Sequence, residues 1–468
     1  MGFGFWSLGF GIFIPRVTIR GVRFPHPLTL LVGCVILAAA LTHIVPAGEY
    51  DRREDPATGR MVVVPGSYHA VESNPLGVLE TGLAFPKGLI EAASVLAVIL
   101  IGGGAFVVVD RTGAFRVALA RLVRRLGTRR SLALPITAFV FAAGGALENM
   151  QEEIIALVPL LLVFMGRLGY NNVTAVAVSV GAAAVGSAFS PMNPFQVGIA
   201  QQLAQVPLFS GAAFRSVVLA IAFAIWVAYT MRYAARSAVP VRDDSTVAAH
   251  ADELSGGRTA LILIIVLTAF AIFVAGLIQW GWGFDHLTAV LFIAGVLAGL
   301  IGRLGVNGTA DAYVQGFRDM VFAAVLVGFA RSISVVLTEG RIIDSVVHGL
   351  FTPLSGLPAA GAAIAMMLAH NVIHVPVPSV SGQAALTMPI LVPLSDLLMI
   401  SRQVTILAYQ YGAGLCEILT PTNGALMAVI AAANVRYDEW IRFAWPAWLI
   451  LTALGAAAIL IGLAIGLA

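Results

Sequence analysis

The sequence predicts an all-α polytopic membrane protein with about nine full spans, arranged as an inverted repeat with two re-entrant hairpins and two broken transmembrane helices. Composition is the first observation behind this fold class: 59% of the residues are hydrophobic and 11% are charged, against about 25% charged residues in soluble domains. The second is that apolar runs near the length of a bilayer span, roughly 20 residues, recur along the chain. The third is that the interruptions of these runs match between the two halves.

The apolar runs divide into full spans and interrupted stretches. Full spans are predicted at residues 28–46, 88–109, 173–206, 217–233, 260–280, 287–301, 320–337, 403–435 and 440–467. Two further stretches, 132–164 and 359–394, are interrupted halfway by polar residues, glycine or proline, and neither half reaches the roughly 20 residues of a span. We therefore expect both to be re-entrant hairpins. The polar segment 49–75 is expected to form an outer loop.

Two of the spans are broken by proline and asparagine. The stretch AFSPMNPFQV, residues 188–197, carries Pro191 and Pro194, and the stretch LTPTN, residues 419–423, carries Pro421. Proline removes backbone hydrogen bonds from a helix, and inside a bilayer each loss is costly unless protein or a water-filled cavity repairs it. A lone proline pair would be interpreted as a kink for packing. Because the break is repeated beside a repeated hairpin, it is predicted to expose backbone and amide groups to a solute.

Identical residues at one constant offset relate the two halves. These residues are Pro159 and Pro389, Pro191 and Pro421, and Asn193 and Asn423. Each half is therefore expected to hold two spans, a hairpin, a broken span and a final span. The extra span 260–280 would turn the second unit over in the membrane, which gives an inverted repeat of the kind common in secondary transporters.

Arginine sets the expected orientation, because positive residues favour cytoplasmic loops. The stretch between the second span and the first hairpin is expected to be a cytoplasmic surface helix, and its arginines are Arg111, Arg116, Arg121, Arg124, Arg125, Arg129 and Arg130. The corresponding stretch of the second half carries only Arg341, which predicts that this stretch faces the outside. The net charge of +3 comes mostly from such loop arginines, so it gives no reason to expect a nucleic-acid partner.

Six segments are predicted from this pattern. Residues 1–27 form a cytoplasmic lead-in, 28–130 the scaffold part of the first repeat, 131–236 its transport part with hairpin and broken helix, 237–258 a charged cytoplasmic linker, 259–352 the linking span with the scaffold part of the second repeat, and 353–468 its transport part with hairpin, broken helix and last span. The lead-in carries its arginines after the apolar residues, unlike a cleavable signal.

The hairpin tips and the breaks carry the candidate site. If the hairpins enter from opposite faces, both tips and both breaks meet near the midplane, where half-helix N-termini and unwound carbonyls bind solutes and cations. The predicted substrate-binding residues are Glu148, Asn149, Glu152, Glu153, Ser190, Asn193, Ser379, Ser381, Thr420, Thr422 and Asn423. The candidates for binding a coupling ion, Na⁺ or H⁺, are Asn149, Asn193, Asn423 and Glu417. No cofactor or other metal is expected, since Cys34 and Cys416 form no metal-type spacing.

Each candidate also has a structural interpretation. Glu152 and Glu153 are equally typical of first-turn acids that stabilise a helix N-terminus. Intramembrane carboxylates such as Glu148 and Glu417 mark ion or substrate paths, or form ion pairs. The remaining alternatives concern the second half: His370 and His374 as proton-relay groups or hydrogen-bonded interior histidines, and Ser379 and Ser381 as binding groups or partners of the tip backbone.

Five segments resemble the anaerobic C4-dicarboxylate carrier family, more particularly its YfcC-type branch, which is often labelled as basic amino acid carriers. They are LTHIVPAGEYDR, ALENMQEEIIALVPLL, SAFSPMNPFQ, PSVSGQAALTMPIL and LTPTNGALMAV. The resemblance covers about residue 25 to the C-terminus and implies membership of the ion transporter superfamily. It further implies a homodimer with a scaffold domain and an elevator-like transport domain, and Ser-Asn-Thr motifs that hold carboxylates and sodium. That motif is partly matched, by Asn149, Ser190 and Asn193 on one side and Ser379, Ser381, Thr420, Thr422 and Asn423 on the other.

The sequence therefore predicts a secondary active transporter in a bacterial inner membrane, with a cytoplasmic N-terminus and a small carboxylate-bearing solute as its substrate. Three glutamates at the first tip favour a basic amino acid, carried by ion-coupled transport or exchange, over a C4-dicarboxylate. A channel fits paired closed tips less well. An intramembrane enzyme is also disfavoured, because H-E-x-x-H, G-x-S-x-G and P-loop motifs are absent from the sequence.

The arginine asymmetry makes a testable prediction about topology. Cysteines introduced near Arg121 and Arg125 are expected to be shielded from a membrane-impermeant thiol reagent in intact cells, whereas cysteines near Arg341 and His348 are expected to be labelled. Equal labelling of both pairs would contradict the inverted repeat.

Overall fold

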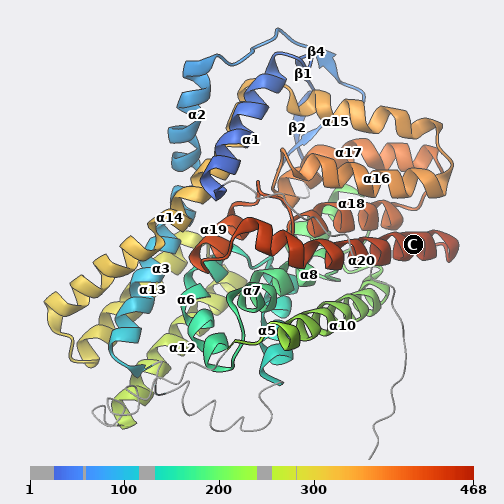
Figure 1. Ribbon diagram of the computed structural model, residues 1–468. Helices are drawn as coiled ribbons and strands as arrows, with labels where there is room; N and C mark the ends of the chain where they lie inside the picture. Colours follow the sequence, from blue (N-terminus) through green and yellow to red (C-terminus); the bar gives the residue numbers. More distant parts are fainter. Residues whose placement is uncertain are drawn as a thin grey trace, which may run out of the picture.

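The protein is almost wholly helical (Figure 1). The structure, a computed structural model, describes residues 26–55, 60–114, 117, 132–239, 256–280 and 282–467. The predicted lead-in up to residue 25, the arginine-rich surface helix beyond Arg111 and most of the charged linker lie outside the described residues. The described residues therefore cover both predicted hairpins and both predicted breaks.

The first half contains a helical hairpin followed by a broken helix, as predicted. Its helices are α1 (Pro27–Thr42), α2 (Val78–Glu91), α3 (Ala93–Arg111), the hairpin α5 (Ala133–Glu148) and α6 (Glu152–Arg167), the broken helix, and α10 (Ala212–Arg236). The broken helix consists of α7 (Asn172–Val176), a π-helical turn η2 (Ala177–Gly181), α8 (Ala182–Ala188), a second π-helical turn η3 (Pro194–Gly198) and α9 (Ile199–Leu203).

The second half repeats this order of elements. Its helices are α12 (Gly256–Trp280), α13 (Phe284–Ile301), α14 (Gly305–Glu339), α15 (Ile343–Phe351) with a short 3₁₀ turn (Thr352–Gly356), the hairpin α16 (Ala359–His374) and α17 (Val380–Leu397), the broken helix α18 (Arg402–Cys416) and α19 (Gly424–Ala432), and α20 (Tyr437–Ala464). The first hairpin arm packs on the first part of the broken helix in both halves, α5 on α8 and α16 on α18.

Five described helices are long and apolar enough to cross a membrane: α3, α10, α13, α14 and α20. Shorter apolar helices of 10–17 residues lie in α1, α5, α7–α8, α12 and α16. The broken helices are split by their proline segments, and each part is therefore shorter than a span. The protein is thus a multi-pass membrane protein, while the count of nine spans and the inversion stay predictions.

Three sequence boundaries differ from the structure. α14 has 35 residues and begins at Gly305, because the polar stretch before Met320 contains no proline and continues the helix. At about 1.5 Å per residue it exceeds the roughly 30 Å of a bilayer core. The predicted span 88–109 consists of two helices, α2 and α3, that meet at Ala92. The outer loop, which an all-α fold leaves irregular, contains four short strands: β1 (Gly48–Glu49), β2 (Arg52–Asp55), β3 (Arg60–Val63) and β4 (His69–Ala70).

The strands of the outer loop form two small antiparallel sheets, β1 with β4 and β2 with β3. Strands this short give almost no alternation of apolar and polar residues, so their sequence carries little strand signal. β3 packs against α17, and β1 packs against α15. The outer loop is therefore fixed onto the second hairpin.

The broken helices form the centre of the molecule. All residues of α18 from Gln403 to Cys416 are buried, and so are all residues of η2 and α8. Small residues permit this packing: a Cβ added at Gly145 of α5 or at Gly186 of α8 would lie 2.0 Å from a carbonyl oxygen of the facing helix. Close approach through small residues is the usual way that membrane helices associate.

A second group of helices surrounds α14, which packs against α1, α2, α3 and α13. Figure 1 shows this group on the left of the molecule and the second hairpin with α18 and α20 on the right. The two groups meet where α14 packs on α19 and where α3 packs on α6. α6 and α19 adjoin the first hairpin tip and the second break, so the candidate site lies next to this boundary.

Candidate functional site

The first hairpin turns at Asn149, whose backbone is left-handed with φ 55°. Asparagine adopts this conformation more readily than most residues with a side chain. α5 therefore ends at Glu148, and α6 begins at Glu152. Gln151 is left between the two arms with only 3% of its surface exposed.

Side chains repair the hydrogen bonds that proline removes at the first break. The Ser190 hydroxyl oxygen accepts the backbone N–H groups of Asn193 at 2.8 Å and Met192 at 3.0 Å, and it donates to the Ala146 carbonyl at 2.6 Å. The Asn193 Oδ1 accepts the N–H groups of Phe195 at 2.9 Å and Gln196 at 3.0 Å. The break is thus stabilised by the two polar residues that the sequence singled out.

The first tip is hydrogen-bonded to the first break. Asn193 Nδ2 donates to the carbonyl of Gly145 at 2.9 Å and to the Ser187 hydroxyl at 3.3 Å. Ser187 in turn donates to the side-chain oxygen of Asn149 and, at 3.1 Å, to that of Gln196. Asn149 and Asn193, both predicted as ligands of a coupling ion, therefore share one buried polar cluster.

The first tip is also hydrogen-bonded to the second break. Asn423 caps α19 by accepting the N–H of Leu426 at 3.2 Å. Its Nδ2 donates to Gln151 Oε1 at 3.1 Å and to the Glu417 carbonyl at 3.2 Å. Gln151 Nε2 donates to the Glu417 carboxylate.

We call this set the tip–break network, and it consists of Asn149, Gln151, Ser187, Asn193, Glu417 and Asn423. Asn149 connects the tip to the first break, and Gln151 connects the same tip to the second break. Thr420 and Thr422 lie on the second break with their hydroxyl oxygens 2.9 Å apart. The structure thus brings one predicted tip together with both predicted breaks.

The tip glutamates point in different directions. Glu152 is half-buried, within electrostatic reach of Arg331 on α14 and of Glu417. Glu153 accepts the Gln151 backbone N–H at 3.2 Å and lines a mainly apolar cavity with residues of α3 and α13. Both occupy the first turn of α6, so their position also fits acids that stabilise a helix N-terminus. The side chain of Glu148 lies outside the described residues.

The second tip makes a different set of contacts. Ser379 caps α17 by accepting the Gly382 N–H at 3.3 Å, and Ser381 is half-buried. In the part of the chain that the structure describes, neither hydroxyl is hydrogen-bonded to a break. α17 nevertheless packs against η3 and α9, and the Tyr409 hydroxyl donates to the Val380 carbonyl at 2.6 Å. A binding role for both serines stays a prediction.

His370 and His374 are fully buried behind this tip and share Gln383. His374 Nδ1 lies 3.0 Å from Gln383 Oε1, and Gln383 Nε2 lies 2.8 Å from His370 Nδ1. This geometry is that of hydrogen-bonded interior histidines, one of the two interpretations that the sequence leaves open.

Sequence reasoning missed the amides and cations that support the breaks. Arg215 is fully buried and donates to neutral oxygens: Ser210 O at 2.8 Å, Gln403 Oε1 at 2.9 Å and Gln410 Oε1 at 3.0 Å. Gln410 in turn donates to the Ser190 carbonyl at 2.7 Å, so hydrogen bonds connect Arg215 to the first break. The overlooked signal was polar residues inside apolar runs, which are costly in a membrane and mark function. The residues it would have found are Gln151, Gln196, Arg331 and Gln410, whereas Arg215 lies just before the predicted span 217–233.

Comparisons with known proteins find similar sequences over most of the chain. The family described as "DcuC: C4-dicarboxylate anaerobic carrier" matches residues 24–464. An Escherichia coli K12 protein named "Putative basic amino acid antiporter YfcC" is 35% identical over 470 residues, covering 90% of this chain and 93% of the relative. An uncharacterized Haemophilus influenzae protein is 26% identical over 482 residues, covering 91% and 94%.

Two solved structures align over most of the chain at low similarity. MtrF of Neisseria gonorrhoeae, reported to illuminate a class of antimetabolite efflux pumps, has a TM-score of 0.42 and 19% identity, covering 95% of this chain and 96% of its own. The YdaH transporter of Alcanivorax borkumensis has the same TM-score and identity, covering 94% and 99%.

The network predicts that Asn193→Ala and Asn423→Ala each abolish transport. Each change removes a helix cap, at a cost of about 1 kcal/mol of stability, and also removes a hydrogen bond between a break and the first tip. Substrate exchange in proteoliposomes measures the effect. Asn171→Ala is the matched control, because Asn171 caps the distant end of the first broken helix by accepting the Thr174 N–H.

The control should lose similar stability and keep exchange. Near-normal transport in both test variants would place the site elsewhere, and an equal loss in Asn171→Ala would reduce the effect to helix capping.

Proposed function

The chain belongs to the DcuC family of C4-dicarboxylate anaerobic carriers, and on this premise we propose that it is a secondary active transporter whose substrate is a basic amino acid. Membership makes it a membrane transporter of small solutes. Transport by ion coupling or by exchange, and the identity of the substrate, are the proposal. The named antiporter at 35% identity supports exchange of a basic amino acid.

The charge around the second break is the observation that carries the proposal. Glu152 is within electrostatic reach of Glu417 and of the Arg331 guanidinium. Two carboxylates and one guanidinium leave one negative charge in excess when all three are ionised. A basic amino acid carries one net positive charge at neutral pH and therefore complements this cluster.

The solute carboxylate requires a different set of partners. The hydroxyls of Thr420 and Thr422 adjoin the N-terminus of α19, where helix geometry favours anions. Ser379 and Ser381 at the second tip are proposed as further partners. An amino acid would then lie with its cationic end toward Glu152 and Glu417.

Coupling is proposed to run through the tip–break network. Glu417 is a buried carboxylate, with 6% of the residue exposed, that accepts a hydrogen bond from Gln151, and it is the candidate carrier of a proton. Oxygens of Asn149, Asn193 and Asn423 would bind Na⁺ if sodium is the coupling ion, since hard cations take oxygen ligands. These roles rest on donor chemistry and geometry.

We further propose an elevator-type transport cycle in an inverted-repeat homodimer of the bacterial inner membrane, with the N-terminus in the cytoplasm. The scaffold parts are residues 28–130 and 259–352, and the transport parts are 131–236 and 353–468. The packing of α14 on α19 and of α3 on α6 is the boundary along which the transport parts would move.

The runner-up substrate is a C4-dicarboxylate, which the family description favours. Two negative charges beside two carboxylates and one guanidinium would require bound cations or protons. The sign of the local charge therefore separates the two candidates.

The test is counterflow of labelled L-arginine into proteoliposomes loaded with unlabelled L-arginine. At an effective dielectric constant of about 20, one charge pair at roughly 4 Å is worth on the order of 4 kcal/mol before desolvation. If a quarter survives, loss of one carboxylate weakens binding about five-fold. Glu152→Gln and Glu417→Gln should therefore raise the arginine concentration at half-maximal exchange and relax discrimination against succinate.

Glu439→Gln is the matched control, since Glu439 is an exposed acid in the first turn of α20. It should behave as wild type. If Glu417 carries the coupling proton, its glutamine variant should still exchange substrate but fail to accumulate it against a gradient. Exchange of succinate rather than arginine by the wild-type protein would replace the proposal with its runner-up.

A further inference from the structure

A cavity of about 540 Å³ lies beneath the outer loop, away from the tip–break network. Its wall is formed by the β1–β3 region, the end of α14, the start of α15 and the second hairpin. Four charged residues line it: Glu49, Arg52, Arg341 and Asp344. Its volume lies within the roughly 300–1,000 Å³ typical of small-molecule sites.

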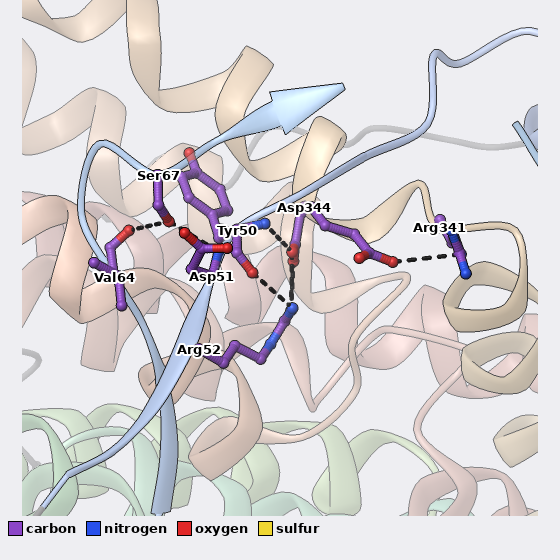
Figure 2. Close-up of polar contacts among 8 residues, drawn as sticks. Tyr50, Asp51, Arg52, Val64, Ser67, Arg341 and Asp344 are labelled. Atoms are coloured by element: carbon purple, nitrogen blue, oxygen red, sulfur yellow. Dashed lines mark hydrogen bonds and ion pairs between the residues drawn. The ribbon is translucent and has the colours of Figure 1, made fainter. Parts of the chain in front are cut away.

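One ion pair of this cavity is structural. Arg52 donates to both carboxylate oxygens of Asp344, at 2.8 and 2.9 Å, and Asp344 also accepts the Tyr50 backbone N–H at 2.9 Å (Figure 2). The Asp344 side chain is only 4% exposed. A buried carboxylate that accepts three such hydrogen bonds is costly to uncouple, so this pair anchors the outer loop to α15.

The second ion pair is loose. Arg341 Nε lies 3.5 Å from Glu49 Oε1, and the two side chains are 47% and 40% exposed. Exposed pairs of this kind contribute about 0–1 kcal/mol. The backbones beneath them are fixed, however, since Gly48 N–H donates to the Arg341 carbonyl at 3.1 Å. Two opposite charges therefore lie at one rim of the cavity, and separating them would cost little stability.

We propose that this cavity is a second binding site for the transported solute, in which Arg341 binds the carboxylate and Glu49 binds the amino or guanidinium group of a basic amino acid. The assignment of the solute rests on the proposed function. On binding, the weak ion pair between Glu49 and Arg341 is replaced by two ion pairs, one from each side chain to the group of opposite charge on the amino acid. Met61, Val63 and Leu337 line the same cavity and offer an apolar surface to the aliphatic part of the solute.

The position of the cavity relates this site to the central one. Val377 and Gly382 also line it, and these residues flank Ser379 and Ser381 at the second tip. Ser379 holds the Gly382 N–H, so the cavity wall and the tip turn are parts of one hydrogen-bonded segment. A solute in the cavity would therefore contact the tip that separates it from the breaks.

The test measures protection of a reporter thiol by L-arginine in purified full-length protein. Met61→Cys places the thiol at the cavity, where Met61 is 58% exposed. Alkylation at residue 61 is followed by peptide mass spectrometry, which separates it from native Cys34 and Cys416. The assay uses a background with Glu152→Gln and Glu417→Gln, the two variants that are expected to weaken arginine binding at the central site.

L-Arginine at about twice its dissociation constant is expected to slow alkylation about three-fold. Glu49→Gln and Arg341→Gln should each abolish this protection, whereas Arg53→Gln and Glu54→Gln should retain it. The last two are matched controls, because both residues are exposed on β2 and neither lines the cavity.

Absence of protection, or protection that survives Glu49→Gln and Arg341→Gln, would overturn the second site. Arginine counterflow by the wild-type protein is measured separately. Counterflow without protection would leave the proposed function standing and remove this site. Protection without counterflow would support the site and remove the proposed transport of arginine.

Discussion

The hydrogen bonds between the first hairpin tip and the two helix breaks are the interaction on which the centre of this structure depends. Asn149 reaches Ser187 beside the first break, and Gln151 reaches Asn423 and Glu417 at the second. In a membrane an unsatisfied backbone or amide group costs several kcal/mol. The tip therefore stabilises both breaks at once.

This arrangement also concentrates charge where the two predicted domains meet. Glu152 and Glu417 lie near the tip, and Arg331 approaches from α14 on the other side of the boundary. A cationic solute that replaces or joins these contacts would change the balance between the two helix groups. The cavity beneath the outer loop also combines charges of both signs. The ion pair between Arg52 and Asp344 fixes the loop, so the weaker pair between Glu49 and Arg341 is not needed to hold it.

Local patterns predicted the hairpins and breaks, because proline, asparagine and a shortage of apolar residues interrupt a helix within a few positions of where they occur. Asn193 and Asn423 were singled out as candidate binding residues for that reason, and the structure shows that both also cap a helix. The network itself depends on long-range contacts: Gln151 and Asn423 are far apart in sequence, and Arg215 is satisfied by neutral oxygens that only the fold brings together. Helix rotation also separates neighbouring side chains: Glu153 lines a cavity with residues of α3 and α13, whereas Glu152 is within electrostatic reach of Glu417. This difference depends on how α6 packs and has no signal in the local sequence.

A double-mutant cycle between Gln151 and Asn423 tests the central claim most directly. The free energy of unfolding is measured in detergent for Gln151→Ala, Asn423→Ala and the double variant, with Gln151→Ala and Asn171→Ala as a distant control pair. If the tip holds the second break, the first pair should show a coupling of about 0.5–3 kcal/mol, and the control pair should be additive within about 0.5 kcal/mol. Additive effects in both pairs would contradict the account.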